Sequence, residues 1–179
     1  MLRAQLASTP TTGGVGYANN TFATRLRNVA RMLGAGMPLR CVTVNAQGGF
    51  DTHADQTTTL QNNLQATCDG IAAFQADLET RGLADRVLIH LWSEFGRRPE
   101  QNDSGTDHGA GGASFVIGTR ANGGFIGEHP GLGTLDDENN LRITSDFRDL
   151  YRALLEQWLG GDSAAIIPGT PGNVPVLVK

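Results

Sequence analysis

The sequence lacks long apolar runs, has few cysteines and shows no concentration of basic residues. Each of these absences argues against a particular class of protein or partner. No stretch approaches the ~20 apolar residues that a membrane-spanning helix needs. Lysine and arginine are scattered and the net charge is −4, which disfavours a nucleic-acid partner. The first residues, MLRAQLASTPTTGG, contain neither a long apolar segment nor paired arginines, so they predict no export signal.

Two cysteines do not settle the redox compartment. Cys41 lies in an apolar run and Cys68 on the expected apolar face of a helix. We therefore expect two buried free thiols rather than a disulfide.

What the sequence does contain is an alternation of apolar runs and amphipathic stretches, within 179 residues that suit one domain. We expect buried strands at 39–44, 86–92 and 114–118, a further edge piece at 124–127, and helices at 21–34, 55–81 and 145–159. The first two strands, joined by the long helix, predict a right-handed parallel βαβ unit. Strands alternating with helices predict a mostly parallel sheet in a three-layer α/β/α sandwich. We divide the chain into a flexible arm at 1–20, this α/β domain at 21–167 and an extended tail at 168–179.

Acidic residues and histidines follow the apolar runs in three places. Asp51 and His53 follow the first expected strand, and their i, i+2 spacing would put both side chains on one side of an extended segment. Carboxylate oxygens and imidazole nitrogens are ligands of Mg²⁺, Mn²⁺, Zn²⁺ and Ca²⁺. This pair is therefore a candidate metal site. The alternative is a turn at Asp51 beside a solvated His53.

Glu94 and Arg97 follow the second expected strand. Glu94 is a candidate metal ligand, and Arg97 or Arg98 could clamp an anionic ester, because a guanidinium matches the geometry of phosphate and sulfate. The alternative is a structural ion pair between one of these arginines and a carboxylate.

The third place is the segment GTDHG, in which glycines flank Asp107 and His108. Glycine allows close approach of the backbone to a ligand. We expect His108 to be a metal ligand or a general acid/base, and Asp107 to be a second ligand or its orienting partner. A purely structural role for the pair is the alternative.

These motifs occur in the order GGFDTHADQ, ADRVLIHLWSEFGRRPEQN, GTDHGAGG, GGFIGEHPGL and TSDFRDLYRALLEQWLG. In this order they resemble the C-terminal half of the family catalogued as domain of unknown function 1501, which is similar to the alkaline phosphatase and sulfatase superfamily. The resemblance implies an alkaline phosphatase-like fold of which this chain is an incomplete part. It also implies a missing N-terminal half that packs against the chain, and an exported, periplasmic full-length parent with a twin-arginine signal.

For function, the resemblance implies a metal-dependent hydrolase of phosphate or sulfate esters, with Asp51, His53, Glu94, Asp107 and His108 as metal ligands. His108 and Arg97 are the expected catalytic residues and a small anionic ester the expected substrate. The superfamily usually has Asp followed by Asn or His where this chain has Glu94 and Phe95, which removes one ligand of a two-metal centre. No Ser or Thr matches the nucleophile motif. The alternative is a non-catalytic exported binding or assembly domain, and a third reading is a cytosolic mutase-like relative.

Overall fold

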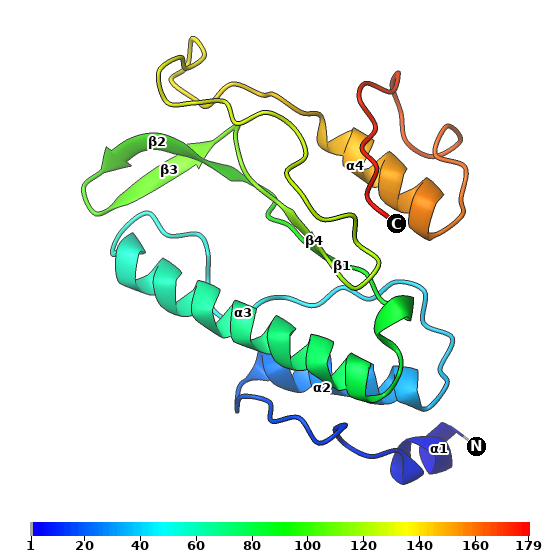
Figure 1. The fold of residues 1–179 in the computed structure, drawn as a ribbon. Helices are drawn as coiled ribbons and strands as arrows, with labels where there is room; N and C mark the ends of the chain where they lie inside the picture. Colours follow the sequence, from blue (N-terminus) through cyan, green and yellow to red (C-terminus); the bar gives the residue numbers. More distant parts are fainter. Residues whose placement is uncertain (1) are drawn as a thin grey trace. The chain divides into compact units, whose positions relative to one another are not determined.

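The computed structural model describes residues 2–179, which divide into two compact units, Met1–Val87 and Leu88–Lys179. The first unit is helical. It contains α1 (Leu2–Ser8), α2 (Thr21–Gly34), α3 (Gln56–Thr80) and the short 3₁₀ turn η1 (Ala84–Arg86), and Figure 1 shows α2 running beside α3. Within residues 2–179, no helix has the length and apolar character required to cross a membrane.

The helices α2 and α3 confirm the two predicted amphipathic stretches. Apolar residues spaced four apart, Phe22, Leu26 and Ala30, are buried along α2, as periodicity predicts. On α3, Ile71, Phe74 and Leu78 are buried. The two helices approach closely at Gly70, where a Cβ atom would lie 2.7 Å from the Phe22 ring. Glycine is therefore required at this helix contact.

The ends of these helices differ in detail from the prediction. Asn20 is the N-cap of α2, and its side chain accepts a hydrogen bond from the backbone N–H of Ala23 at 2.8 Å. Asp55 precedes α3 as expected but has a left-handed backbone (φ 49°) and makes no side-chain cap bond. Gly82 follows α3 with φ 67°, the left-handed conformation in which glycine commonly ends a helix.

A buried Asp77 fastens the N-terminal segment to α3. Its carboxylate accepts hydrogen bonds from the Gly13 N–H at 2.5 Å, the Tyr17 hydroxyl at 2.9 Å and Arg81 Nε at 2.8 Å. Burial and the adjacent Asp77 carboxylate raise the pKa of the Tyr17 phenol. Residues 13–17, within the segment expected to be an arm, are therefore held against α3.

The second unit contains four short strands in two separate antiparallel pairs. β1 (Ile89–Leu91) pairs with β4 (Phe115–Ile117), and β2 (Gly96–Asn102) pairs with β3 (Gly105–Gly109). The β2–β3 register shifts between Arg97 and Gln101. Pro99 lies within this shift and has no N–H to donate to the ladder.

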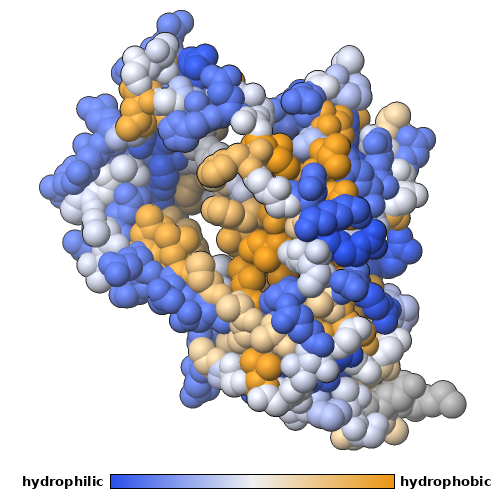
Figure 2. Space-filling model, in the orientation of Figure 1, coloured by the Kyte–Doolittle hydropathy of each residue, from blue (hydrophilic) through white to orange (hydrophobic). Residues whose placement is uncertain are grey.

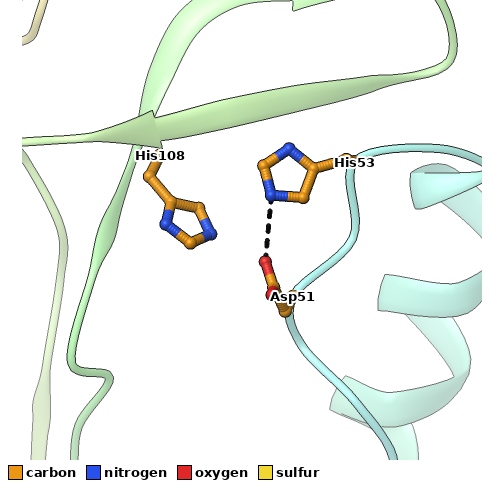
Figure 3. Close-up of side chains that lie close together, drawn as sticks. All are labelled: Asp51, His53 and His108. Carbon is orange, nitrogen blue, oxygen red and sulfur yellow. Dashed lines mark ion pairs between the residues drawn. The ribbon is translucent and has the colours of Figure 1, made fainter.

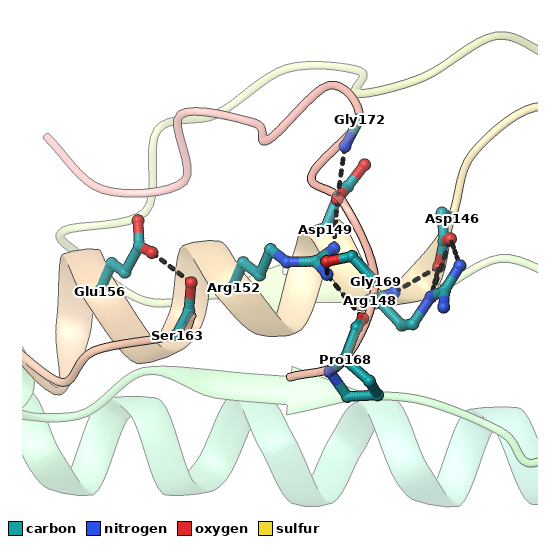
Figure 4. Close-up of polar contacts among 9 residues, drawn as sticks. All are labelled: Asp146, Arg148, Asp149, Arg152, Glu156, Ser163, Pro168, Gly169 and Gly172. Carbon is teal, nitrogen blue, oxygen red and sulfur yellow. Dashed lines mark hydrogen bonds and ion pairs between the residues drawn. The ribbon is translucent and has the colours of Figure 1, made fainter. Parts of the chain in front are cut away.

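The last helix, α4 (Phe147–Ala153), continues as the π-helical turn η2 (Leu154–Trp158) and precedes Gly160 at φ 68°. The helix begins two residues later than expected, and Asp146 is its N-cap. The buried Arg152 donates to Asp149 and to the carbonyls of Pro168 and Gly169, which fastens the start of the tail to α4 (Figure 4). Leu177, only 1% exposed, lies near the end of the tail.

These findings contradict the predicted parallel three-layer sandwich. Residues 39–44 form no strand, and 86–92 contains only the three-residue β1, whose partner β4 is antiparallel to it. An apolar run of six or seven residues does not specify its pairing, because periodicity cannot distinguish a buried strand from other buried chain. Residues 124–127 also form no strand. The predicted burial of the two thiols is wrong as well, since Cys41 and Cys68 are both exposed.

Apolar side chains remain at the surface, visible as orange patches in Figure 2. In the second unit the most exposed large ones are Phe125, Leu132, Ile143 and Ile166.

Candidate functional site

The segment carrying Asp51 and His53 is fastened to α3 at two points. Asn63 Nδ2 donates to the Gly49 carbonyl at 2.7 Å, and Gln56 Nε2 donates to the Thr52 hydroxyl at 3.1 Å. Gly48 has φ 87°, a conformation that favours glycine, and a Cβ there would clash with the Asn63 side chain. These bonds explain why GGFDTH has a defined conformation without belonging to a strand.

Within this segment, His53 Nε2 lies 3.1 Å from Asp51 Oδ1, as the dashed line in Figure 3 shows. The side chains are 48% and 64% exposed, respectively. In a tetrahedral site, two ligand atoms bound to one Zn²⁺ at about 2.0–2.2 Å lie about 3.3–3.6 Å apart. The oxygen and nitrogen therefore have the chemistry to hold one divalent ion together after a small side-chain movement. The same contact also serves as a simple surface ion pair.

His108, also labelled in Figure 3, lies on β3 in the second unit, where its strand partner is Arg97. Its ring stacks on the Phe95 ring, with centroids 3.9 Å apart and planes at 10°. The Arg97 guanidinium carbon lies 5.1 Å from the same Phe95 ring, within cation–π range. Asp51, His53 and His108 are all exposed, and each offers one atom suited to binding a metal.

Glycines bring the backbones at the base of this hairpin into contact. A Cβ on Gly96 would lie 1.8 Å from the Gly111 carbonyl oxygen, and one on Gly109 would lie 2.7 Å from the Arg97 backbone. GTDHG therefore has a defined conformation, in close contact with the start of β2. It is a strand in which glycine serves close packing.

Asp107 and Glu94, the other two expected ligands, also lie in the second unit. Asp107 Oδ1 accepts from Asn102 Nδ2 at 2.7 Å. Neighbouring residues of a strand point to opposite faces, so Asp107 and His108 are poorly arranged to chelate as a pair. Glu94 is exposed in the bend between β1 and β2, and no ion pair of residues 2–179 includes it. Both residues remain predictions as ligands.

The two arginines make structural bonds to backbone carbonyls. Arg97 Nη1 donates to Thr106 O at 2.6 Å, across the hairpin. Arg98 donates to His108 O at 3.3 Å and to Glu138 O at 2.9 Å. These bonds hold β3 and the 136–140 turn against β2, and the Arg97 role in substrate binding remains a prediction.

The other histidines have local roles. His90 on β1 meets Tyr151 edge to face with ring centroids 5.9 Å apart, and burial lowers its pKa. His90 Nε2 is buried and has no hydrogen-bond partner among residues 2–179. His129 Nδ1 accepts from the Gly131 N–H at 3.0 Å, which stabilises a turn.

Sequence reasoning missed two buried polar networks, Tyr17–Asp77–Arg81 and Asp149–Arg152. The signal was present in the helical spacing of their charges, i, i+4 for Asp77 with Arg81 and i, i+3 for Asp149 with Arg152. It did not reveal that both pairs are buried.

Comparison with known proteins gives one family match. The model for Protein of unknown function (DUF1501) matches residues 4–170. No curated protein and no solved structure matches the chain. The match covers nearly the whole chain, including all three motifs, and the chain therefore belongs to the DUF1501 family.

Proposed function

We propose that this chain is part of a metal-dependent hydrolase of phosphate or sulfate esters, related to the alkaline phosphatase and sulfatase superfamily. The observation that carries the proposal is the exposed Asp51–His53 pair, whose oxygen and nitrogen lie 3.1 Å apart in a segment fastened to α3. An imidazole nitrogen beside a carboxylate oxygen suits Zn²⁺ best, whereas Mn²⁺, Mg²⁺ and Ca²⁺, the other expected ions, prefer oxygen ligands. Asp51 and His53 would hold the ion, with His108, Asp107 and Glu94 as further candidate ligands.

A bound divalent ion would polarise the ester oxygens and stabilise charge on the departing group. The side chains have complementary tasks in the proposal. Arg97 binds the anionic ester, and His108 is either a ligand or the group that transfers a proton to the leaving oxygen. The nucleophile comes from the N-terminal half that the resemblance implies, in an exported parent protein.

The proposal is tested first by metal binding. The purified chain, stripped with a chelator and dialysed, is titrated with Zn²⁺ and Mn²⁺ by calorimetry, and bound metal is counted by elemental analysis. We expect saturable binding that Asp51→Asn and His53→Ala each weaken at least tenfold. Glu100→Gln, which removes another exposed carboxylate, is the matched control. Unchanged affinity in both site variants would refute the site.

Turnover is then measured, with p-nitrophenyl phosphate and p-nitrophenyl sulfate, on the chain and on any longer polypeptide that its gene specifies. Metal-dependent hydrolysis by the parent, lost in Asp51→Asn, supports the hydrolase.

A second candidate function is a non-catalytic binding or assembly domain. Two observations favour it. Phe95 stands next to Glu94 where the superfamily pattern has another ligand, and Phe125, Leu132 and Ile143 leave apolar surface exposed. Metal binding by the parent without hydrolysis of either ester would support this function instead.

A further inference from the structure

The closest aromatic contact in the second unit is the stack of Phe95 on His108. The centroid distance of 3.9 Å and the angle of 10° make it a face-to-face contact of two flat rings. Phe95 is half-buried, whereas His108 is exposed. A histidine held only by its own strand would rotate about its side-chain bonds, and the Phe95 ring restricts that rotation.

The backbone segments that carry the two rings are held close together. Gly96 pairs with Gly109, and the Arg97 N–H donates to Gly111 O at 3.1 Å. Phe95 directly precedes β2, and His108 is the residue before the last one of β3. The close contacts of Gly96 and Gly109 hold these two positions next to each other. The stack is thus a product of hairpin register.

The orientation has a chemical consequence for His108. The lone pair with which an imidazole binds a metal lies in the plane of the ring, so a partner stacked on the ring face does not occupy it. If the His108 ring already has a fixed direction, its side chain loses less entropy when it binds an ion. Partners that orient a metal-binding histidine raise metal affinity without touching the metal.

We propose that Phe95 is a positioning residue that holds the His108 ring in the direction required for metal binding. The inference rests on the proposed function, because it takes His108 as a ligand. The inference also gives a role to Phe95, which stands where the superfamily usually has Asn or His. Its side chain has no donor atom for a metal, but it orients the donor atom of His108.

The test combines an orientation readout with an affinity readout on the whole chain. Proton–carbon NMR spectra of histidine-labelled, metal-free protein are recorded for the wild type, Phe95→Leu and Phe95→Tyr, with His108→Gln to assign the signals. A ring stacked face to face shifts the His108 ring protons upfield. Zn²⁺ affinity is measured on the same samples. Phe115→Leu, at an exposed phenylalanine on β4, is the control.

We expect the upfield shift in the wild type and in Phe95→Tyr, and its loss in Phe95→Leu. Zn²⁺ affinity should fall about tenfold in Phe95→Leu and remain near wild type in Phe95→Tyr and Phe115→Leu. Loss of the shift with unchanged Zn²⁺ affinity would overturn the positioning role and leave the proposed function standing.

Two other outcomes are distinct from that one. A wild-type spectrum without the shift would overturn the inference whether or not Phe95→Leu folds. Retention of the shift in a wild-type protein that binds no Zn²⁺, Mn²⁺, Mg²⁺ or Ca²⁺ would overturn the proposed function, and the inference with it.

Discussion

Arg152 and Asp149 form an ion pair one helical turn apart, at 2.8 Å, with side chains only 2% and 8% exposed (Figure 4). The guanidinium also donates to the Pro168 and Gly169 carbonyls, each at 2.8 Å, and the carboxylate accepts from the Gly172 N–H at 3.2 Å. One buried pair therefore satisfies three backbone groups of residues 168–172. This relation makes the tail part of the folded second unit.

Arg152→Met should strongly destabilise the second unit. It leaves the Asp149 charge and two carbonyls without their donor, and removing one partner of a buried pair typically costs about 3–5 kcal/mol. Urea unfolding followed by circular dichroism measures the loss. Arg148→Met is the matched control, because Arg148 pairs with Asp146 at the surface and should change stability little. Equal effects of the two variants would contradict the assigned role.

Tyr17→Phe should release the N-terminal segment from α3. The hydroxyl donates to Asp77 in a partly buried contact, so we expect a loss of about 1 kcal/mol and faster hydrogen exchange at the Gly13 N–H. Asp77 keeps Arg81 as a partner, so the helix itself should persist.

The raised pKa of Tyr17 predicts how stability depends on alkaline pH. The folded chain favours the neutral phenol, whereas the unfolded chain ionises near the ordinary pKa of 10.0. The contribution of the neutral Tyr17 phenol to folding stability is therefore complete below pH 10.0 and declines as the pH rises above that value. In a Tyr151→Phe variant, Tyr17 is the one remaining tyrosine. Its phenolate absorbance should appear only when the chain unfolds, or at a pH well above the ordinary tyrosine pKa. Ionisation at the ordinary pKa in the folded chain would contradict this.

Gly96→Ala should disrupt the β2–β3 hairpin. Its Cβ would lie 1.8 Å from the Gly111 carbonyl oxygen, so the backbone must move, at a cost of about 1–3 kcal/mol or more. Gly123→Ala is the control, since no heavy atom lies within 4 Å of its added Cβ. Thermal unfolding compares the two variants. Equal melting temperatures would show that the strands do not approach so closely in solution.

His108→Ala should abolish Zn²⁺ binding and leave the fold nearly intact. The side chain is exposed and contributes little burial, so we expect stability within about 0.5 kcal/mol of wild type. Calorimetric titration and circular dichroism measure the two effects on one sample. Unfolding of the variant with metal occupancy unchanged would contradict a ligand role for His108.

The sequence predicted the helices better than the sheet. The buried positions of α2 and α3 repeat at helical spacing, a local signal that tertiary packing preserves. The strands were misjudged because pairing direction and register depend on residues distant in sequence. Gly96 and Gly109 are neighbours across the two strands, and their close packing follows from this pairing rather than from either glycine alone.

For the candidate site, the sequence identified residue types but not their partners. Asp51 and His53 could be paired from their spacing, and they lie 3.1 Å apart. The stack of Phe95 on His108 could not be predicted, because it follows from the hairpin register.

The division of the chain between Val87 and Leu88 places its cysteines and its tryptophans in different units. Both cysteines, Cys41 and Cys68, are exposed in the first unit, whereas both tryptophans, Trp92 and Trp158, belong to the second. A fluorescent dye attached to these thiols therefore reports on the unfolding of the first unit through its emission. Intrinsic tryptophan emission reports on the second unit in the same sample, and no mutation is needed. Superimposable denaturation curves from the two signals would show that the units unfold as one cooperative body, and separated curves would assign each its own stability.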